Sequence, residues 1–549
     1  MIELDPSRFK QQPFPPMAHQ LVGVKAIVKH PAFYLGDKPR TCKSRQVVDA
    51  ACVLSENKLI DLVLVIAPVA GRAVWGDTEM GQIKTWAWRR SRVCQFHAKT
   101  KDLWSDENPE MLWVVTNYDF VRSKNRLDDI CRRLQRFKSV MLVLDESAAL
   151  GNEKSQQSKA VERIRWLKKC PYCGGFDVET ERSRKVKLHE CLGCHKKFTD
   201  KTAAFICSRV VMLNGSDELP PNIWSQFNIL DNVLSRRYAT FTTFKWQFME
   251  YGPPHTLQKK VPVKGGGEKV VWQKQVCDEI GWKNIEKLSR ITAPYVLRRE
   301  RKDCPELRNI PVLYDIKEVA LSKSTWRMYQ QLKREAIIEL EKEVYVSTNA
   351  GVRLMRLAQI TSGHLGGFEE GEKTRDLSSE KLDFVVDHLT NVCTARNLIV
   401  WCRWVRERER LSAMLKEFGF VVYELYGGQK KTERRVAEKV FSGGGVNLPR
   451  DERHAILAQP QAGGICLDLS AASEVYRTSS DYSTKTREQS DDRPLGPAQR
   501  AEAVTYTDVL ATGPRGERTM DHIIVAALRA KKNLALLTSS EWRKKLEEE

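Results

Sequence analysis

The sequence predicts an α/β fold made of two units, each with a parallel β-sheet covered by helices. Short, continuous apolar runs such as LVLVIA at 62–67 have the length and composition of central parallel strands. They alternate with segments of helical periodicity, which is the pattern of doubly wound sheets. The alternation occurs before residue 231 and again after residue 379, and 549 residues are too many for a single hydrophobic core.

Composition limits the class of protein and its partners. The chain is 42% hydrophobic and 29% charged without a long apolar run, so we expect no membrane span. The N-terminus lacks a basic segment followed by an apolar one, so we expect no secretory signal and a reducing, cytoplasmic compartment. The 14 cysteines should then be thiols or metal ligands. The net charge of +20 favours a nucleic-acid partner, although a chain that is simply basic fits the same value.

The first strand, loop and helix are predicted in FYLGDKPRTCKSRQVVDAA, residues 33–51. In a phosphate-binding loop, backbone N–H groups surround a phosphate, a lysine neutralises it, and the next hydroxyl holds Mg²⁺. Lys43 and Ser44 fit these two side-chain roles. Cys42, however, stands where such a loop has glycine, and a positive φ there would cost about 1 kcal/mol or more. The alternative is a helix start in which the Lys-Ser pair is accidental.

Two acidic residues end the fourth predicted strand. After LVLVIAP come the strand-like runs WVVTNYDF at 113–120 and SVMLVLDESAAL at 139–150, which places Asp145 and Glu146 at a carboxyl end. Ligands of parallel sheets bind at this edge. In nucleotide hydrolases such an Asp holds Mg²⁺, and the adjacent acid polarises the attacking water. A solvated strand end is the alternative interpretation.

Two C-x-x-C motifs follow, Cys170 with Cys173 and Cys191 with Cys194, and 17 residues separate them. This spacing is typical of a structural zinc ribbon, in which four thiolates form a closed tetrahedral site. A reducing compartment disfavours redox disulfides, and His189 and His195 are expected beside the site rather than in it. The basic, hairpin-like stretch ERSRKVKLH between the motifs either touches a phosphate backbone or is a solvated β-ribbon.

The remaining segments complete the predicted organisation. Residues 1–231 form the first lobe, with the zinc ribbon inserted at about 168–200. Residues 232–378 show few strand signals and predict a mostly helical protrusion or linker, whose basic run LRRERKD at 297–303 either contacts DNA or forms a solvated face. Residues 379–537 form the second lobe, and residues 538–549 are expected to be a polar, frayed tail.

Taken in order, these segments resemble the motifs of superfamily-two helicase-like ATPases of the Swi/Snf type, most closely the compact versions of bacteriophage and bacterial genomes. In the first lobe the similar segments are FPPMAHQLVGV (adenine-reading segment), GDKPRTCKS (motif I), VLVIAP (motif Ia), LVLDES (motif II), LNGSDELPPNIWSQFNILD (motif III) and YVLRRERKD. In the second they are NLIVWCRW (motif IV), AGGICLDLSAAS (motif V) and QSDDRPLGPAQ (motif VI). Their collinear order over two α/β units carries the resemblance more than any single motif does.

The resemblance implies two RecA-like lobes that bind ATP between them and move along duplex DNA. Carried over by position, the site residues are Gln20 for adenine, Lys43 and Ser44 for phosphate and Mg²⁺, Asp145 for Mg²⁺, Glu146 for the attacking water, Arg493 as an arginine finger and Gln489 for coupling the lobes.

Departures from the family pattern accompany the match. They are Cys42 for the loop glycine, Lys38 for Glu, Ser216-Asp217 for Thr-Pro in motif III, Cys466 for Gly in motif V and Gly496 for the second arginine of motif VI. A finger arginine is worth about 10³ to 10⁵ in rate, so losing one of two arginines lowers turnover.

We therefore expect an ATP-dependent, helicase-like DNA translocase with ATP, Mg²⁺ and a structural Zn²⁺, in the cytoplasm of a bacterium or a phage-infected cell. The alternative, motivated by Cys42, Cys466 and Gly496, is a catalytically weakened or inactive helicase-fold protein that acts as a nucleic-acid-binding scaffold. RNA in place of DNA is a third, weaker option.

Overall fold

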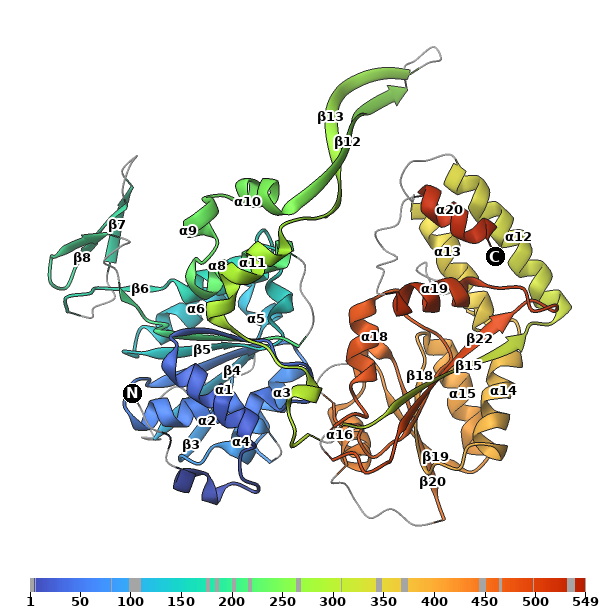
Figure 1. The fold of residues 1–549 in the computed structure, drawn as a ribbon, viewed down its shortest axis with the longest axis horizontal. Helices are drawn as coiled ribbons and strands as arrows, with labels where there is room; N and C mark the ends of the chain where they lie inside the picture. The colour runs from blue at the N-terminus through green and yellow to red at the C-terminus, as the bar shows by residue number, and fades with distance from the viewer. Residues whose placement is uncertain are drawn as a thin grey trace. The chain divides into compact units, whose positions relative to one another are not determined.

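The computed structural model divides the chain into two compact units, Met1–Glu306 and Leu307–Glu549 (Figure 1). The residues that the structure describes are 4, 6–79, 81–97, 110–173, 178–182, 187–199, 204–215, 220–262, 268–307, 309–341, 348–366, 374–443, 451–463, 467–496, 498–530 and 539–548. Each unit is built around its own parallel sheet, so the predicted α/β fold with two parallel-sheet lobes is confirmed.

A seven-stranded sheet forms the centre of the first unit, in the order β14-β1-β11-β5-β2-β4-β3, and all neighbouring strands are parallel. The strands are β1 (Ala32–Leu35), β2 (Leu62–Ala67), β3 (Ser91–Gln95), β4 (Met111–Asn117), β5 (Val140–Leu144), β11 (Arg209–Leu213) and β14 (Val296–Leu297). Every residue of β2, β4 and β5 is buried, which explains their continuous apolar sequences.

Helices cover both faces of this sheet, because alternate residues of its strands belong to two different core clusters. Leu64 lies in one cluster, and Val63 and Val65 lie in the other. Helices α1 (Ala18–Lys29), α2 (Lys43–Glu56), α3 (Gly71–Gly76) and α4 (Gln82–Trp86) contribute to the Val63 side. Helices α5 (Tyr118–Val121), α6 (Lys124–Leu134), α7 (Gln156–Arg165) and α8 (Pro220–Asp231) contribute to the Leu64 side.

The cysteine-rich segment is inserted into the first unit between β5 and β11. A short antiparallel pair, β6 (Lys168–Lys169) with β10 (Ala204–Phe205), forms its base. Beyond that pair, β7 (Val178–Arg182), β8 (Lys187–Cys191) and β9 (Lys197–Thr199) form a three-stranded antiparallel sheet. The hairpin predicted between the two C-x-x-C motifs is therefore present as β7 and β8.

Residues 232–378, expected to be mostly helical, contain helices but also a long hairpin. Strands β12 (Met249–Pro262) and β13 (Glu268–Trp282) pair antiparallel and extend away from the first sheet (Figure 1). The apolar residues of β13 are interrupted by charged and polar ones without a regular period of two, so the sequence did not indicate a strand there. The neighbouring helices are α9 (Ser235–Tyr238), α10 (Phe241–Phe248) and α11 (Ile285–Thr292).

A six-stranded sheet in the order β15-β22-β21-β18-β20-β19 forms the second unit, and its neighbouring strands are also parallel. The strands are β15 (Val312–Ala320), β18 (Asn397–Trp401), β19 (Phe420–Leu425), β20 (Arg453–Ala458), β21 (Glu474–Arg477) and β22 (Val504–Thr512). The helices are α12 (Lys323–Glu341), α13 (Thr348–Thr361), α14 (Glu380–Asn391), α15 (Val405–Glu417), α16 (Lys431–Phe441), α17 (Pro460–Gly463), α18 (Thr484–Asp491) and α19 (Met520–Arg529). Strand β15 lies within the segment expected to be a helical linker.

The C-terminal segment differs from the frayed tail that the sequence predicted. Ser539–Glu547 forms helix α20, and Trp542 and Leu546 are buried in a cluster with residues of α12, α13 and α19. The prediction was wrong because these two apolar residues, four apart on one helical face, were outweighed by their charged neighbours. Among the described residues, no helix is both long and apolar enough to cross a membrane.

Candidate nucleotide site and cysteine cluster

The loop between β1 and α2 has the backbone shape that glycine favours, although it contains other residues there. Cys42 precedes α2 with φ 57° and ψ 48°, and Arg40 has φ 68°. Both values lie in the left-handed region, which costs about 1–2 kcal/mol for a residue with a Cβ. The position predicted to need glycine therefore does adopt a positive φ, and α2 begins directly after it at Lys43.

Lys43 directs its ammonium back into this loop. Its Nζ donates to the carbonyl oxygen of Asp37 at 2.6 Å and to that of Lys38 at 3.2 Å. Ser44 follows in the first turn of α2. Gly215, after β11, packs against the loop so closely that an added Cβ would lie 2.8 Å from Cδ of Pro39. The loop therefore packs against the residues that follow β11, at the carboxyl ends of the parallel strands.

Asp145 and Glu146 follow β5 at the same edge of the sheet, since β5 and β1 are both neighbours of β11. Burial and, after it, the charge of Glu146 raise the pKa of Asp145 to about 6, against the opposing effects of the hydrogen bond from Trp75 and the charge of Lys43. Lys43, at the end of the loop after β1, and Asp145, after β5, thus lie at the carboxyl ends of two strands that only β11 separates. Glu146 has φ 48°, another left-handed backbone at this edge.

Two residues that the sequence did not single out hold Asp145 in place. The indole N–H of the fully buried Trp75 donates to Asp145 Oδ2 at 2.7 Å. The hydroxyl of Tyr118 donates to the carbonyl oxygen of Asp145 at 2.8 Å. Trp75 lies in α3, just after the Pro68 that ends the second predicted strand, but neither tryptophan nor tyrosine at these positions indicates a carboxylate partner from local sequence alone.

Gln20 lies in the first turn of α1 and is only 1% exposed. Its Oε1 accepts a hydrogen bond from the backbone N–H of Met17 at 2.9 Å, which caps the helix. In this structure Gln20 therefore caps helix α1, and its contact with adenine stays a prediction.

Arg493 and Gln489 lie together in the second unit, where Gln489 belongs to α18 and Arg493 follows that helix. Arg493 is 7% exposed, and its Nε donates to the carbonyl oxygen of Gln489 at 2.7 Å. A second guanidinium nitrogen donates to the carbonyl oxygen of Leu467 at 3.4 Å. The predicted finger is thus bonded to carbonyls of its own unit.

The structure separates the predicted residues into two groups. Lys43, Ser44, Asp145 and Glu146 gather at one edge of the first sheet, and Arg493 and Gln489 belong to the second unit. Ser216, Asp217 and Cys466 lie outside the described residues. The basic run at 297–303 was expected to touch DNA or solvent, but its Arg299 forms an ion pair with Asp37 inside the first unit.

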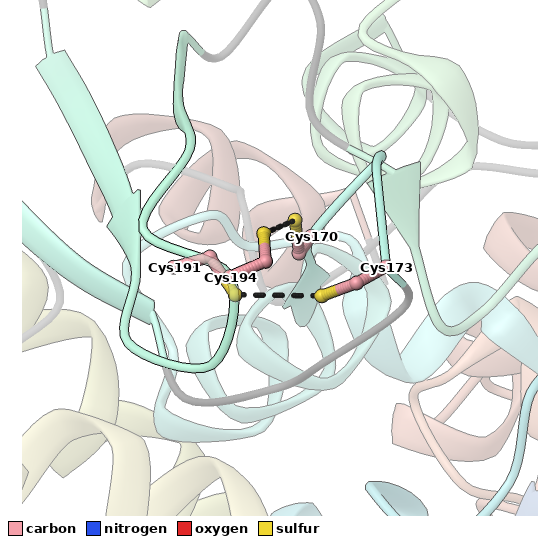
Figure 2. A group of neighbouring side chains, drawn as sticks. All are labelled: Cys170, Cys173, Cys191 and Cys194. Carbon is pink, nitrogen blue, oxygen red and sulfur yellow. Dashed lines mark hydrogen bonds between the residues drawn. The ribbon is translucent and has the colours of Figure 1, made fainter.

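The four predicted zinc cysteines form one group in the inserted segment (Figure 2). Their sulfur atoms all lie within 4.8 Å of one another, and two pairs, Cys170 with Cys194 and Cys173 with Cys191, are 3.6 Å apart. A tetrahedral site with Zn–S bonds of 2.3 Å requires S–S distances of about 3.8 Å, so this set of four thiols fits a zinc ion.

Neither nearby histidine belongs to this group, as predicted. His189 is buried and its Nε2 is 2.8 Å from Nζ of Lys168, while His195 is exposed. The cluster is therefore suited to hold a metal ion with sulfur ligands alone.

Comparisons with known proteins give a distant sequence relative and a set of similar solved structures. No protein-family model matches the chain. Over 269 residues, 47% of the chain, it is 24% identical to YwqA of Bacillus subtilis (strain 168), which is named as a candidate ATP-dependent helicase/translocase. The alignment spans 28% of the length of that relative.

Among solved structures, the SWI2/SNF2 ATPase core of Sulfolobus solfataricus in complex with dsDNA aligns over 99% of this chain and 96% of its own, with 17% identity and a TM-score of 0.37. The SWI2/SNF2 ATPase core domain of the same organism aligns over 98% and 95%, with 17% identity and a TM-score of 0.36. From the sequence comparison, the chain is a distant relative, over about half its length, of a candidate helicase/translocase.

Proposed function

We propose that this protein is an ATP-dependent, helicase-like DNA translocase that couples ATP hydrolysis to movement on duplex DNA. The observation that carries the proposal is the meeting of two features at one sheet edge. A loop with left-handed residues at positions 40 and 42 leads into Lys43 and Ser44, and Asp145 follows β5 at the same carboxyl-end edge of the sheet.

The donor set at this edge fits a magnesium-bound triphosphate. The Ser44 hydroxyl and the Asp145 carboxylate are oxygen ligands of the kind that Mg²⁺ prefers, and Mg²⁺ would supply neutralisation of phosphate charge there. Lys43 would neutralise phosphate oxygens once it exchanges its bonds to the loop carbonyls for them. Glu146 would orient the attacking water and accept its proton.

The second unit would contribute Arg493, which stabilises negative charge on the transferred phosphoryl group if it reaches the nucleotide, and Gln489, which would couple the units. Gln20 would contact adenine. The net charge of +20 supports a polyanionic track, and the resemblance to Swi/Snf-type ATPases makes duplex DNA the first choice and RNA the second. We assign zinc to the cluster of Cys170, Cys173, Cys191 and Cys194, where it would stabilise the inserted segment.

A DNA-stimulated ATPase assay tests the proposal. The purified chain should release phosphate faster when duplex DNA is added, and Lys43→Ala and Glu146→Gln should abolish this release. Glu146→Gln should still bind nucleotide, because it removes the base and keeps the loop. Equal hydrolysis by the native chain and Glu146→Gln would refute the proposal. Competition between DNA and RNA duplexes at one salt concentration identifies the polymer.

A second candidate function is a nucleic-acid-binding scaffold on a weakened ATPase fold. It is favoured by the strained Cys42 in the loop and by the internal hydrogen bonds of Arg493. It predicts salt-sensitive DNA binding that ATP leaves unchanged, with no turnover above background.

A further inference from the structure

The segment Val296–Glu306, which we call the strap, lies along the phosphate loop within the first unit. It begins with β14, which pairs parallel with β1. The contact continues past the end of β1, because the N–H of Gly36 donates to the carbonyl oxygen of Leu297 at 2.8 Å and that of Lys38 donates to Arg299 at 3.0 Å. The first half of the loop is therefore bonded to the strap through its backbone.

Arg299 fastens the strap to the same part of the loop through its side chain. Its Nε donates to Asp37 Oδ1 at 3.0 Å, and a terminal nitrogen donates to Oδ2, which makes a two-point ion pair. Asp37 is fully buried, so this pair is its charge compensation. The guanidinium also donates to Gln46 Oε1 at 3.1 Å and to the carbonyl oxygen of His19, which joins α2 and α1 to the same point.

A second connection reaches the other end of the loop. Glu306, the last residue of the first unit, accepts a hydrogen bond from the N–H of Ala18 at 2.8 Å and lies 3.4 Å from Nδ1 of His19. The other ring nitrogen of His19 is 3.2 Å from the carbonyl oxygen of Thr41, which directly precedes Cys42. The strap is thus linked to the loop at both residue 37 and residue 41.

These links converge on the loop lysine. Asp37 uses its carboxylate for Arg299 and its carbonyl oxygen for Nζ of Lys43, at 2.6 Å. A displacement of Arg299 would therefore move Asp37 and, with it, a hydrogen-bond partner of Lys43. The strap also continues directly into the second unit at Leu307.

We propose that the strap holds the phosphate loop in the shape that binds nucleotide, with Arg299 as the positioning residue. This shape includes the left-handed Arg40 and Cys42, whose strain must be held by surrounding contacts. The consequence for nucleotide affinity rests on the proposed function, whereas the effect on the loop itself does not. The strap is continuous in sequence with the second unit and is hydrogen-bonded to the loop, so it links that unit to the loop.

Hydrogen exchange and nucleotide binding test the strap with two matched variants. Arg299→Gln removes the ion pair, and Lys302→Gln makes the same change in charge at an exposed residue of the strap. Without nucleotide, amides in residues 33–42 should exchange about tenfold faster in Arg299→Gln. This factor is expected when the lost interaction had lowered the equilibrium constant for local opening of the loop about tenfold. The affinity for ADP should fall by about the same factor. Lys302→Gln should change neither quantity.

A double variant, Asp37→Asn with Arg299→Gln, covers the case in which the single variant fails to fold. It removes the buried charge that Arg299→Gln leaves unpaired, so it should fold and still show fast exchange in the loop. If the loop amides exchange at the native rate in the double variant, or in a folded Arg299→Gln, the proposal that the strap holds the loop is wrong. If the native chain binds no ADP while Arg299→Gln loosens the loop, the proposed function fails and the strap stands.

Discussion

Replacing Cys42 by glycine should stabilise the first unit. Cys42 has φ 57° and ψ 48°, a conformation that costs about 1–2 kcal/mol for a residue with a Cβ. Glycine avoids this cost but loses about 0.5–1 kcal/mol in additional chain entropy on folding. The difference predicts a gain of about 0.5–1 kcal/mol in the free energy of unfolding. Cys42→Ala keeps the Cβ and should show none of this gain.

Urea denaturation of the native chain, C42G and C42A measures these differences directly, and a shift of about 2 °C in Tm should accompany the gain in C42G. Titration with ADP should show tighter binding by C42G, because a Cβ no longer stands where the backbone approaches phosphate. Equal stabilities for C42G and C42A would refute the reasoning, since the two variants differ only in the Cβ. Weaker ADP binding by C42G would show that the loop does not approach phosphate in this way.

Three further predictions concern the first unit. Trp75→Phe should weaken Mg²⁺-dependent ADP binding about tenfold by freeing Asp145, whereas Trp113→Phe, an equally buried control, should leave the affinity unchanged. Cys173→Ser should lower the zinc content measured by metal analysis, and zinc-free protein as purified would contradict the cluster assignment. Burial raises the pKa of Asp49 to about 6, so stability in urea should fall as the pH rises from about 4 to about 6, and Asp49→Asn should flatten that dependence.

The strands and the positions of the candidate nucleotide residues next to them could be predicted because their signals are local. A parallel strand buried on both faces needs a continuous apolar run, and LVLVIA at 62–67 becomes β2 with every residue buried. The loop lysine and the strand-end acids follow from their places next to such strands. Because β1, β11 and β5 are neighbours in the sheet, the strand order alone places Lys43 and Asp145 at the same edge.

The supporting contacts could not be predicted because their partners are distant in sequence. Asp37 and Arg299 are 262 residues apart, and the run that contains Arg299 has the same composition as a solvated or DNA-binding surface. Trp75 and Asp145 are 70 residues apart, and a buried tryptophan is ordinarily assigned to the core. In both cases the fold, rather than the local pattern, decides which polar group each side chain meets.

The two departures in motifs I and VI differ in how readily they could be reversed. At Cys42 the backbone already has the left-handed shape that glycine would adopt, so a single substitution restores the family pattern. At Gly496 an added Cβ would lie 2.9 Å from Oδ1 of Asp468 and 3.2 Å from Cβ of Ser470, so a larger side chain there requires both residues to shift. Of these two motif VI positions, only position 493 carries an arginine. That arginine is 7% exposed and donates to two carbonyl oxygens of its own unit, so the structure shows it in a structural role within the second unit.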